Sequence, residues 1–384
     1  MKKVIVIGTD AVNALGLVQS LGREGLYVIV LIEGKKSFLI SSSKYVKEIM
    51  YYQTTDDIPK ILLSNFIEKN KICVFASGDG VARVLDQNYA LLQPYFLFEH
   101  AYGDYSIQQL MNKDLQVQLA NRHNFLVPNS VYIKRPFIIP KDLTYPCIVK
   151  PLISCLGDKR DILIAYSEKE LNDIITNQIQ YSNELIIQEY IEKDYEYDIM
   201  GCSFQDNTVY MPLSDRMVKF NRNLQNTSTV SYIEPFDEDI AKELPKIKSL
   251  MMDIKYVGLF SVEFIHSKVN SKIYFTEINF RNDGENAFIV HEGVNLPYLH
   301  YQDLSQIPLK KYFPSTKSKK YIWEGIHFNA LLYRDISVFE WIRDIIGVNG
   351  FLYFFKDDPK PFFKQFGLKF KGIFNKIRRL MKIV

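Results

Sequence analysis

Three short β-branched segments near the N-terminus, separated by helix-like segments, constrain the fold of this chain most. The β-branched runs are residues 4–7 (VIVI), 27–32 (YVIVLI) and 72–76 (ICVFA), and residues 11–22 and 58–69 show helical spacing between them. Strands that alternate with helices indicate a parallel sheet, because parallel strands need a long crossover connection. We therefore expect the chain to begin with a parallel-sheet domain of the α/β class.

The first strand-to-helix turn bears on whether this sheet binds a dinucleotide. The turn reads GTDAVNALG (residues 8–16) and lacks the GxGxxG glycines, and only Glu33 stands about twenty residues further on. Without spaced glycines the backbone cannot approach a pyrophosphate closely. We therefore favour a sheet domain whose loop tips, including residues 77–80 (SGDG), border a substrate, and we rank dinucleotide binding well below it.

The pattern of the chain changes near residue 108 and again near residue 304. Between these positions, helical segments such as 167–178 and 238–255 separate pairs of strands, which is typical of an α+β domain. After residue 304, aromatic and basic residues become more frequent, and Asp358 is the last acid. We predict three parts, namely residues 1–108, 109–304 and 305–384.

Composition excludes several classes of protein. The net charge of +3 is too small and too dispersed for a nucleic-acid surface, so we expect no nucleic-acid partner. No apolar run reaches the roughly 18 residues that span a bilayer, and the chain is predicted to be cytoplasmic. The histidines lack the spacing of a zinc site. The cysteines lack CxxC spacing and suit reduced thiols: Cys73, Cys147, Cys155 and Cys202.

Three polar side chains of different chemistry follow one apolar segment at every second position. After residues 272–275 come Glu277, Asn279 and Arg281. Side chains on a strand alternate between faces, so a carboxylate, an amide and a guanidinium would point the same way. The arginine could then hold a phosphoryl or carboxylate oxygen next to the two oxygen-bearing side chains.

The preceding strand brings a second carboxylate opposite the first. A short loop around Asn270 would fold residues 258–267 back, so that Glu263 lies across from Glu277. Two facing carboxylates repel each other, and a bound divalent cation would remove that repulsion. Magnesium takes oxygen ligands and commonly bridges to phosphates, so this hairpin suits a partial magnesium shell. A solvated hairpin face with a salt bridge is the open alternative.

Two lysines are candidates for binding an anion. The apolar strand of residues 145–149 delivers Lys150 at its end, where burying an unpaired ammonium would be costly. Lys113 stands ahead of a helix from Asp114, whose first amide groups would add to an anion site. The alternative is that Lys150 extends to the surface along apolar neighbours.

An apolar strand that runs into acidic residues is a candidate nucleotide contact. Residues 184–192 (ELIIQEYIE) are followed by Asp194, Glu196 and Asp198, which read as a loop. Exposed backbone flanked by Tyr190 and Ile191 could enclose a purine, and Glu196 could accept hydrogen bonds from a ribose. A solvated acidic loop is the plain alternative.

Taken in this order, the segments resemble the ATP-grasp superfamily, a group of ATP-dependent carboxylate-amine and carboxylate-thiol ligases. The resemblance covers residues 1 to about 304, and its most specific element is Glu263 with Glu277-x-Asn279-x-Arg281 downstream of Lys150. It implies a Rossmann-like N-terminal domain followed by an ATP-grasp fold, in a chain of mixed α/β and α+β class. Residues 280–299 resemble D-aspartate-ligase-like members and those that tailor cell-surface polysaccharides or peptides.

The resemblance also implies a role for each candidate residue. The groups expected to bind ATP are Lys113 and Lys150 for the phosphates, Glu189, Tyr190 and Ile191 for adenine, Glu196 for ribose, and Ser154 in the phosphate loop. The expected ligands of Mg²⁺ or Mn²⁺ are Glu263, Glu277 and Asn279. The expected catalytic cations are Arg281, Arg216 and Lys219. The loop of residues 152–161 departs from the family pattern because it holds few glycines and serines.

The implied reaction joins a small carboxylate to an amine. ATP phosphorylates the carboxylate, the amine attacks the acylphosphate, and an amide, ADP and phosphate result. Carboxyphosphate chemistry on bicarbonate, as in biotin carboxylase or carbamoyl phosphate synthase, is the nearest alternative. A nucleotide-binding module without catalysis is the second, and a nicotinamide oxidoreductase ranks last. Substrate identity and oligomeric state stay open.

The end of the chain has the pattern of a basic amphipathic helix. Within residues 361–384, apolar side chains recur at helical spacing and Lys or Arg fill much of the remainder, without any acid. Such a helix is typical of a membrane surface or of partner docking. We expect peripheral contact with the inner membrane face, with a helix packed on its own domain as the equal alternative.

Overall fold

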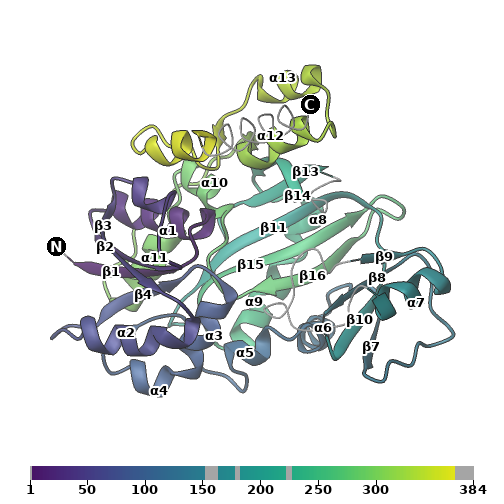
Figure 1. Cartoon of the computed structure of the whole chain (residues 1–384), viewed down its shortest axis with the longest axis horizontal. Coiled ribbons are helices and arrows are strands. Elements are labelled where there is room, and N and C mark those ends of the chain that lie inside the picture. The colour runs from purple at the N-terminus through teal and green to yellow at the C-terminus, as the bar shows by residue number, and fades with distance from the viewer. Residues whose placement is uncertain (1, 152–162, 178–181, 222–226, 368–384) are drawn as a thin grey trace, which may run out of the picture.

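The computed structural model describes residues 2–151, 163–177, 182–221 and 227–367. The described residues build three sheets (Figure 1). A five-stranded sheet lies at the N-terminal end, a four-stranded sheet lies at the opposite end, and a nine-stranded sheet lies between them. The mixed α/β and α+β class predicted from the sequence is confirmed.

The N-terminal sheet is parallel throughout, with strand order β3-β2-β1-β4-β5. Its strands are β1 (Lys3–Gly8), β2 (Tyr27–Glu33), β3 (Val46–Tyr52), β4 (Ile72–Ala76) and β5 (Phe96–Leu97). Its helices are α1 (Val12–Arg23), α2 (Ile58–Asn65), α3 (Asp79–Gln87) and α4 (Tyr89–Leu92), with short 3₁₀ turns η1 (Ile40–Ser42) and η2 (Thr55–Asp57). The predicted parallel sheet is confirmed, and edge strand β3 is an element that sequence reasoning missed.

The small sheet is antiparallel, with strand order β7-β10-β8-β9. Its elements are β7 (Ser130–Lys134), β8 (Cys147–Pro151), β9 (Leu163–Ala165), β10 (Glu184–Glu189) and helix α7 (Glu168–Asn177). The apolar face of α7 packs on this sheet and forms a separate small core. Because this core is its own, the small sheet is a distinct unit beside the large one.

The large sheet runs β16-β15-β11-β13-β14-β17-β18, with β12 paired to β11 and β6 paired to β15. Its strands are β6 (His100–Ala101), β11 (Lys193–Ser203), β12 (Val209–Tyr210), β13 (Ser214–Asn221), β14 (Thr227–Glu234), β15 (Tyr256–Ser267), β16 (Ile273–Asn279), β17 (Lys319–Ile322) and β18 (Gly350–Phe351). Strands β17 and β18 come from beyond residue 304, so the last part of the chain completes an edge of this sheet.

Helices cover the large sheet and connect it to the other two. They are α5 (Ile107–Leu110), α6 (Lys113–Arg122), α8 (Glu238–Ala241), α9 (Leu244–Asp253), α10 (Asn286–His291), α11 (Leu296–Leu304), α12 (Glu324–Leu332) and α13 (Val338–Ile345). The prediction of one helix over 238–255 is wrong, because α8 ends at Ala241 and α9 starts anew with Pro245 in its first turn. Proline suits a helix start because its missing N–H would have no partner there.

The segment after residue 304 also folds back onto the N-terminal sheet domain. Buried Asp358 accepts hydrogen bonds from Gln19 Nε2 at 3.0 Å, Ser43 Oγ at 2.6 Å and the Lys44 backbone N at 3.0 Å. Next to it, Arg23 Nε donates to Asp357 at 2.9 Å. The segment around Asp357 and Asp358 is therefore held on the N-terminal sheet domain by polar contacts, of which those of Asp358 are largely buried. Within the described residues, no helix combines the length and the apolar character needed to cross a bilayer.

Candidate active site

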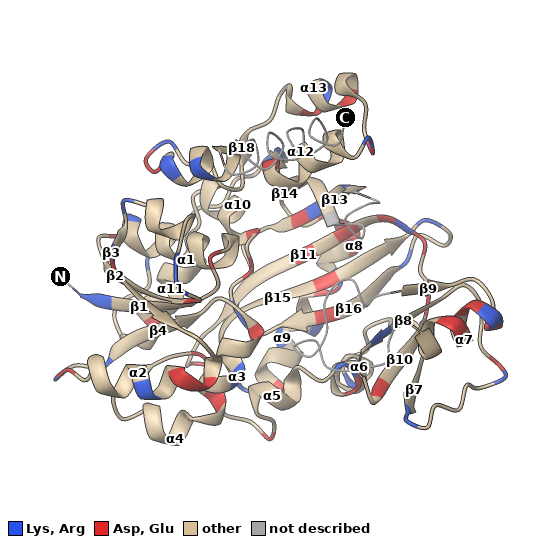
Figure 2. Cartoon of the chain, viewed as in Figure 1, with Lys and Arg blue, Asp and Glu red and all other residues tan. Residues whose placement is uncertain are grey.

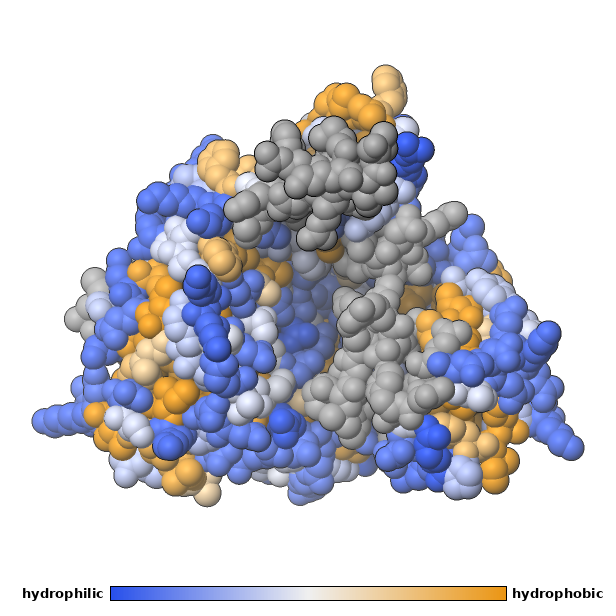
Figure 3. All heavy atoms as spheres, viewed as in Figure 1, coloured by the Kyte–Doolittle hydropathy of each residue, from blue (hydrophilic) through white to orange (hydrophobic). Residues whose placement is uncertain are grey.

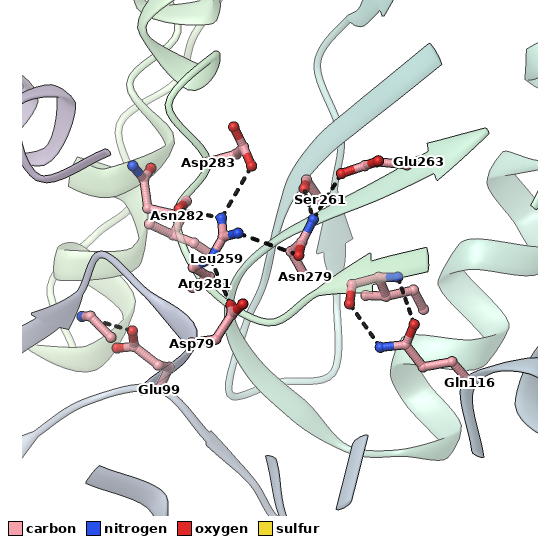
Figure 4. Close-up of polar contacts among 12 residues, drawn as sticks. Asp79, Glu99, Gln116, Leu259, Ser261, Glu263, Asn279, Arg281, Asn282 and Asp283 are labelled. Atoms are coloured by element: carbon pink, nitrogen blue, oxygen red, sulfur yellow. Dashed lines mark hydrogen bonds and ion pairs between the residues drawn. The ribbon is translucent and has the colours of Figure 1, made fainter. Parts of the chain in front are cut away.

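The β15–β16 hairpin brings the predicted metal ligands together. Glu263 and Glu277 are directly paired across the two strands, as the sequence predicted. Asn279 Nδ2 donates to Glu263 Oε1 at 3.1 Å and to Ser261 Oγ at 3.3 Å (Figure 4). A bulge follows Glu263, and Thr276 Oγ1 donates to the Glu263 carbonyl at 2.8 Å, which fixes the local backbone. Two carboxylates and an amide oxygen thus share one small region.

Lys113, at the first position of α6, reaches this hairpin. Its Nζ lies 2.5 Å from Glu277 Oε2. Burial acts to lower the pKa of Lys113, but the Glu277 carboxylate outweighs burial and the pKa is raised. The expectation that the first helix amides add to an anion site is wrong for two of them, because Asp114 N and Leu115 N donate to the capping oxygen of Asn112. The cation of this segment is therefore the lysine itself.

Lys150 lies on β8 in the small sheet, near the same carboxylates. Its Nζ donates to Gln188 Oε1 at 3.1 Å, and Gln188 Nε2 donates in turn to Ser130 Oγ at 2.9 Å. Burial lowers the pKa of Lys150 to about 8, with a further lowering by Lys113 and a partial offset by Glu277. Among the described residues, a neutral amide is the hydrogen-bond partner of this buried lysine, and such burial is costly, so the arrangement favours an anionic ligand.

Arg281 follows the end of β16 and contacts the N-terminal sheet domain, strand β16 and the loop after it. Its Nε donates to Asp79 Oδ1 at 2.7 Å, its Nη1 to Asp283 Oδ2 at 3.1 Å and its Nη2 to Asn279 Oδ1 at 3.4 Å (Figure 4). Burial acts to lower the pKa of Arg281, but the two aspartates raise it. Asp79 belongs to the loop tip 77–80, so the N-terminal sheet domain borders this region.

The residues predicted to bind adenine and ribose lie where β10 leads into β11. Glu189 Oε2 accepts from Asn129 N at 3.2 Å, and Tyr190 N donates to the Pro146 carbonyl at 3.2 Å. Ile191 is buried, and Glu196 Oε1 accepts from Lys193 Nζ at 2.9 Å. Residues 189–191 are thus hydrogen-bonded to the small sheet and its neighbouring loops, and the chain then continues into β11 of the large sheet.

Two other predicted residues do not join this group, and a third lies outside the described residues. Arg216 pairs with Glu234 and is directly opposite Tyr197, so it lies on the face of the sheet away from Glu263. Lys219 Nζ lies 2.5 Å from Asp344 of α13. The structure therefore gives both cations carboxylate partners elsewhere. Ser154 is outside the described residues.

Sequence reasoning missed two aspartates that extend the row of carboxylates. The acids after residue 192 read as a loop, but Glu196 and Asp198 lie on β11, which spans Lys193–Ser203. Asp198 is directly paired with Glu263 on one side and with Asp215 of β13 on the other. The alternation of acids along β11 was the available signal. It indicated a strand with one polar face rather than a loop.

The donor set fits a divalent ion shared with phosphates. Glu263, Glu277 and Asn279 supply oxygen atoms on one hairpin, and Lys113 and Lys150 supply positive charge beside them. Within the described residues no three or more His, Cys, Asp or Glu side chains form a complete metal cage. A partial shell of this kind suits Mg²⁺, which commonly takes its remaining ligands from water and substrate phosphates. Figure 3 shows a hydrophilic hollow in the middle of the face that it draws, and Figure 2 shows acidic residues on the strands of the large sheet.

A small antiparallel sheet that delivers a buried lysine toward carboxylates on a larger sheet is the arrangement of an ATP-grasp domain. The family model described as "Carbamoyl-phosphate synthase L chain, ATP binding domain" matches residues 111–294. The region it matches includes both lysines and the whole β15–β16 hairpin. Residues 111–294 thus match an ATP-grasp domain, as the resemblance implied.

Individual proteins agree with this family. D-alanine–D-alanine ligase of Campylobacter jejuni subsp. jejuni serotype O:2 is 28% identical over 177 residues, which are 44% of this chain and 49% of that protein. D-aspartate ligase of Enterococcus faecium (strain Aus0004) is 21% identical over 281 residues, 67% and 65% of the two chains. The chain thus spans about half to two thirds of the length of these relatives. The fold of Staphylococcus aureus N5-carboxyaminoimidazole synthetase complexed with ADP matches with TM-score 0.68 and 18% identity, over 87% and 86% of the two chains.

Proposed function

We propose that this protein is an ATP- and Mg²⁺-dependent ligase that activates a small carboxylate as an acylphosphate and joins it to an amine. The observation that carries the proposal is the pairing of Glu263 with Glu277 beside two buried lysines. A divalent ion would bind the oxygens of two facing carboxylates, and a polyphosphate would take the positive charge of both ammonium groups.

Each residue of the site has a part in this proposal. Glu263, Glu277 and Asn279 would hold Mg²⁺ or Mn²⁺, and the ion would supply charge that offsets the negative phosphates. The remaining groups would act on the nucleotide: Lys113 and Lys150 on phosphate oxygens, the backbone of Glu189, Tyr190 and Ile191 on adenine, and Glu196 on ribose. A protein with a matching fold forms a complex with ADP, which supports nucleotide binding by this fold.

Arg281 would orient the transferred phosphoryl group or the carboxylate that receives it. Its guanidinium is held by Asp79 and Asp283 beside the ligand oxygen of Asn279. A guanidinium fixed in this way needs little reorganisation when charge develops next to it. Arg216 and Lys219 are left out of the proposal because both are paired with carboxylates away from this group.

The relatives support an amino-acid-like substrate. The two curated relatives are named as ligases of D-alanine and of D-aspartate, which are small amino acids. We propose a reaction of the same kind, with a place in the tailoring of a cell-surface polysaccharide or peptide. Carboxyphosphate chemistry on bicarbonate is the second candidate, favoured by the description of the matching family model. Dependence of ATP turnover on added bicarbonate would distinguish the two.

We further propose that residues 361–384 contact a membrane surface, with the exposed side chains of α13 beside them. On α13 the side chains of Val338, Phe339 and Ile342 are 63%, 80% and 48% exposed, and Phe363 is 64% exposed. Figure 3 shows hydrophobic residues at the top of the face, over α13. The ring centroid of Phe366 instead lies 5.9 Å from that of Phe328 on α12, which supports the alternative of a helix docked on its own domain. We also propose that the boundaries between the three parts of the chain lie near residues 108 and 304.

The proposal is tested by trapping the acylphosphate with hydroxylamine. Full-length protein, ATP and Mg²⁺ are incubated with a panel of amino acids and sugar acids, and hydroxamate is measured. We expect one carboxylate of the panel to give hydroxamate and ADP together, and Glu277→Gln to lower the yield at least about tenfold. Glu48→Gln, on the edge strand β3, is the control and should match the wild type.

A further inference from the structure

Four carboxylates form a continuous row across the large sheet. The directly paired positions run from Glu277 on β16 through Glu263 on β15 and Asp198 on β11 to Asp215 on β13. Directly paired side chains on neighbouring strands point to the same face. The proposed metal site uses the first two carboxylates only, so the last two lie beside it without a role in nucleotide binding.

Asp198 and Asp215 are buried, with exposed fractions of 4% and 0%. Oδ1 of Asp198 and both carboxylate oxygens of Asp215 accept no hydrogen bond of good geometry from the described part of the chain, although the Ser231 hydroxyl lies near Asp215. Most buried polar groups of native proteins are hydrogen-bonded, and a buried carboxylate without a partner is especially costly. Such a pair next to a reaction centre indicates a missing cationic ligand.

Nearby cations of the protein are already engaged with other acids. Lys113 is paired with Glu277, and Arg281 is paired with Asp79 and Asp283. Arg281 donates to both Asp79 and Asp283. No described residue makes an equivalent contact with Asp198 or Asp215, since no lysine, arginine or histidine among them forms an ion pair with either aspartate, although the charge of Arg281 acts on Asp198.

The chemistry of the two aspartates favours an organic ammonium over a metal ion. An ammonium group offers three N–H donors and one positive charge, which matches two carboxylates with free acceptor positions. It would also lie on the strand next to the carboxylates proposed to hold the metal.

We propose that Asp198 and Asp215 form the subsite that binds the ammonium group of the amine substrate. The substrate would enter as a cation, beside the place where the acylphosphate forms. Its identification as the acceptor rests on the proposed ligase function, whereas binding of an ammonium group there does not. The chemical class of acceptor is thus a primary amine, such as the amino group of an amino acid or an amino sugar.

Thermal unfolding with simple amines tests the subsite without knowledge of the substrate. The full-length protein is melted in methylammonium chloride, tetramethylammonium chloride and sodium chloride at equal ionic strength. We expect methylammonium to raise the Tm by about 2 °C over sodium, and tetramethylammonium, which has no N–H donor, to leave it unchanged. Asp198→Asn and Asp215→Asn should each abolish the rise. Asp206→Asn, in the exposed turn after β11, should keep it.

The outcomes separate this inference from the proposed function. Equal melting of the wild type in methylammonium and sodium chloride would overturn the subsite, even if hydroxamate forms. A methylammonium effect that persists in both aspartate variants would overturn it as well, because the cation would then bind elsewhere. A specific effect without any hydroxamate would support the subsite and remove the ligase reaction. The wild-type comparison stands even if a variant does not fold.

Discussion

At the scale of single residues, the two lysines show how burial and charge prepare a site for phosphate. Lys113 and Lys150 lie near the same carboxylates, yet their pKa values move in opposite directions. Lys113 has a carboxylate partner at 2.5 Å, whereas Lys150 donates to the neutral amide of Gln188. Burial therefore dominates for Lys150 and the Glu277 carboxylate dominates for Lys113.

The lowered pKa of Lys150 predicts how nucleotide affinity depends on pH. A bound phosphate would raise the pKa of Lys150 again, so the nucleotide binds the protonated lysine more tightly than the neutral one. The affinity is therefore highest well below pH 8 and falls as the pH rises above 8. We expect the Kd for MgATP to rise about tenfold between pH 7 and pH 9, because the lysine of the free protein loses its charge in this range. Calorimetric titration across that range measures the effect. Lys150→Met should bind weakly with a flat profile over this range, and a pH-independent wild type would contradict the account.

Sequence reasoning succeeded for residues whose partners are close in the chain. Glu263 and Glu277 were paired correctly because one short loop around Asn270 joins their strands. It missed Asp198 and Asp215, because the acids after residue 192 read as a loop and because β11 pairs with β15, a strand far away in sequence. It also placed Arg216 with the site. Arg216 is paired with Tyr197 and therefore lies on the face of the sheet opposite Asp198 and Glu263, which sequence spacing does not reveal.

At the scale of elements, strongly patterned segments were predictable and weakly patterned ones were not. Strands β1, β2 and β4 are buried β-branched runs, and all three were expected. The edge strand β3 carries exposed polar residues, and β18 has only two residues, so neither has a clear hydrophobic period. Their place is decided by tertiary pairing with neighbours, which local sequence does not encode.

The C-terminal elements carry a prediction about membranes. Helix α13 exposes Val338, Phe339 and Ile342, and residues 368–384 add cations without acids. We expect the full-length chain to float with vesicles that contain anionic lipid, and a chain ending at residue 358 to float markedly less. Neutral vesicles serve as the control, because they lack the attraction for lysine and arginine. Equal flotation of the two chains would remove the proposal.

At the scale of the whole molecule, the three sheets converge on one region. The N-terminal sheet domain supplies Asp79, the small sheet supplies Lys150, and the large sheet supplies the row of carboxylates (Figure 1). Beyond the large sheet, the contacts of Asp358 with Gln19 and Ser43 hold the C-terminal segment on the N-terminal sheet. A site assembled from three sheets depends on their relative placement, so the sequence could predict its parts more readily than its completeness.

Binding of Mn²⁺ in the presence and absence of nucleotide tests the central claim most directly. The claim is that Glu263, Glu277 and Asn279 hold a divalent ion whose other ligands come from a nucleotide triphosphate. Electron paramagnetic resonance reports free Mn²⁺ as it is taken up by the full-length chain, with or without a non-hydrolysable ATP analogue. We expect tight uptake only with the analogue, and at least about tenfold weaker uptake in Glu263→Gln and Glu277→Gln. Equal uptake by the wild type and both variants would contradict the account.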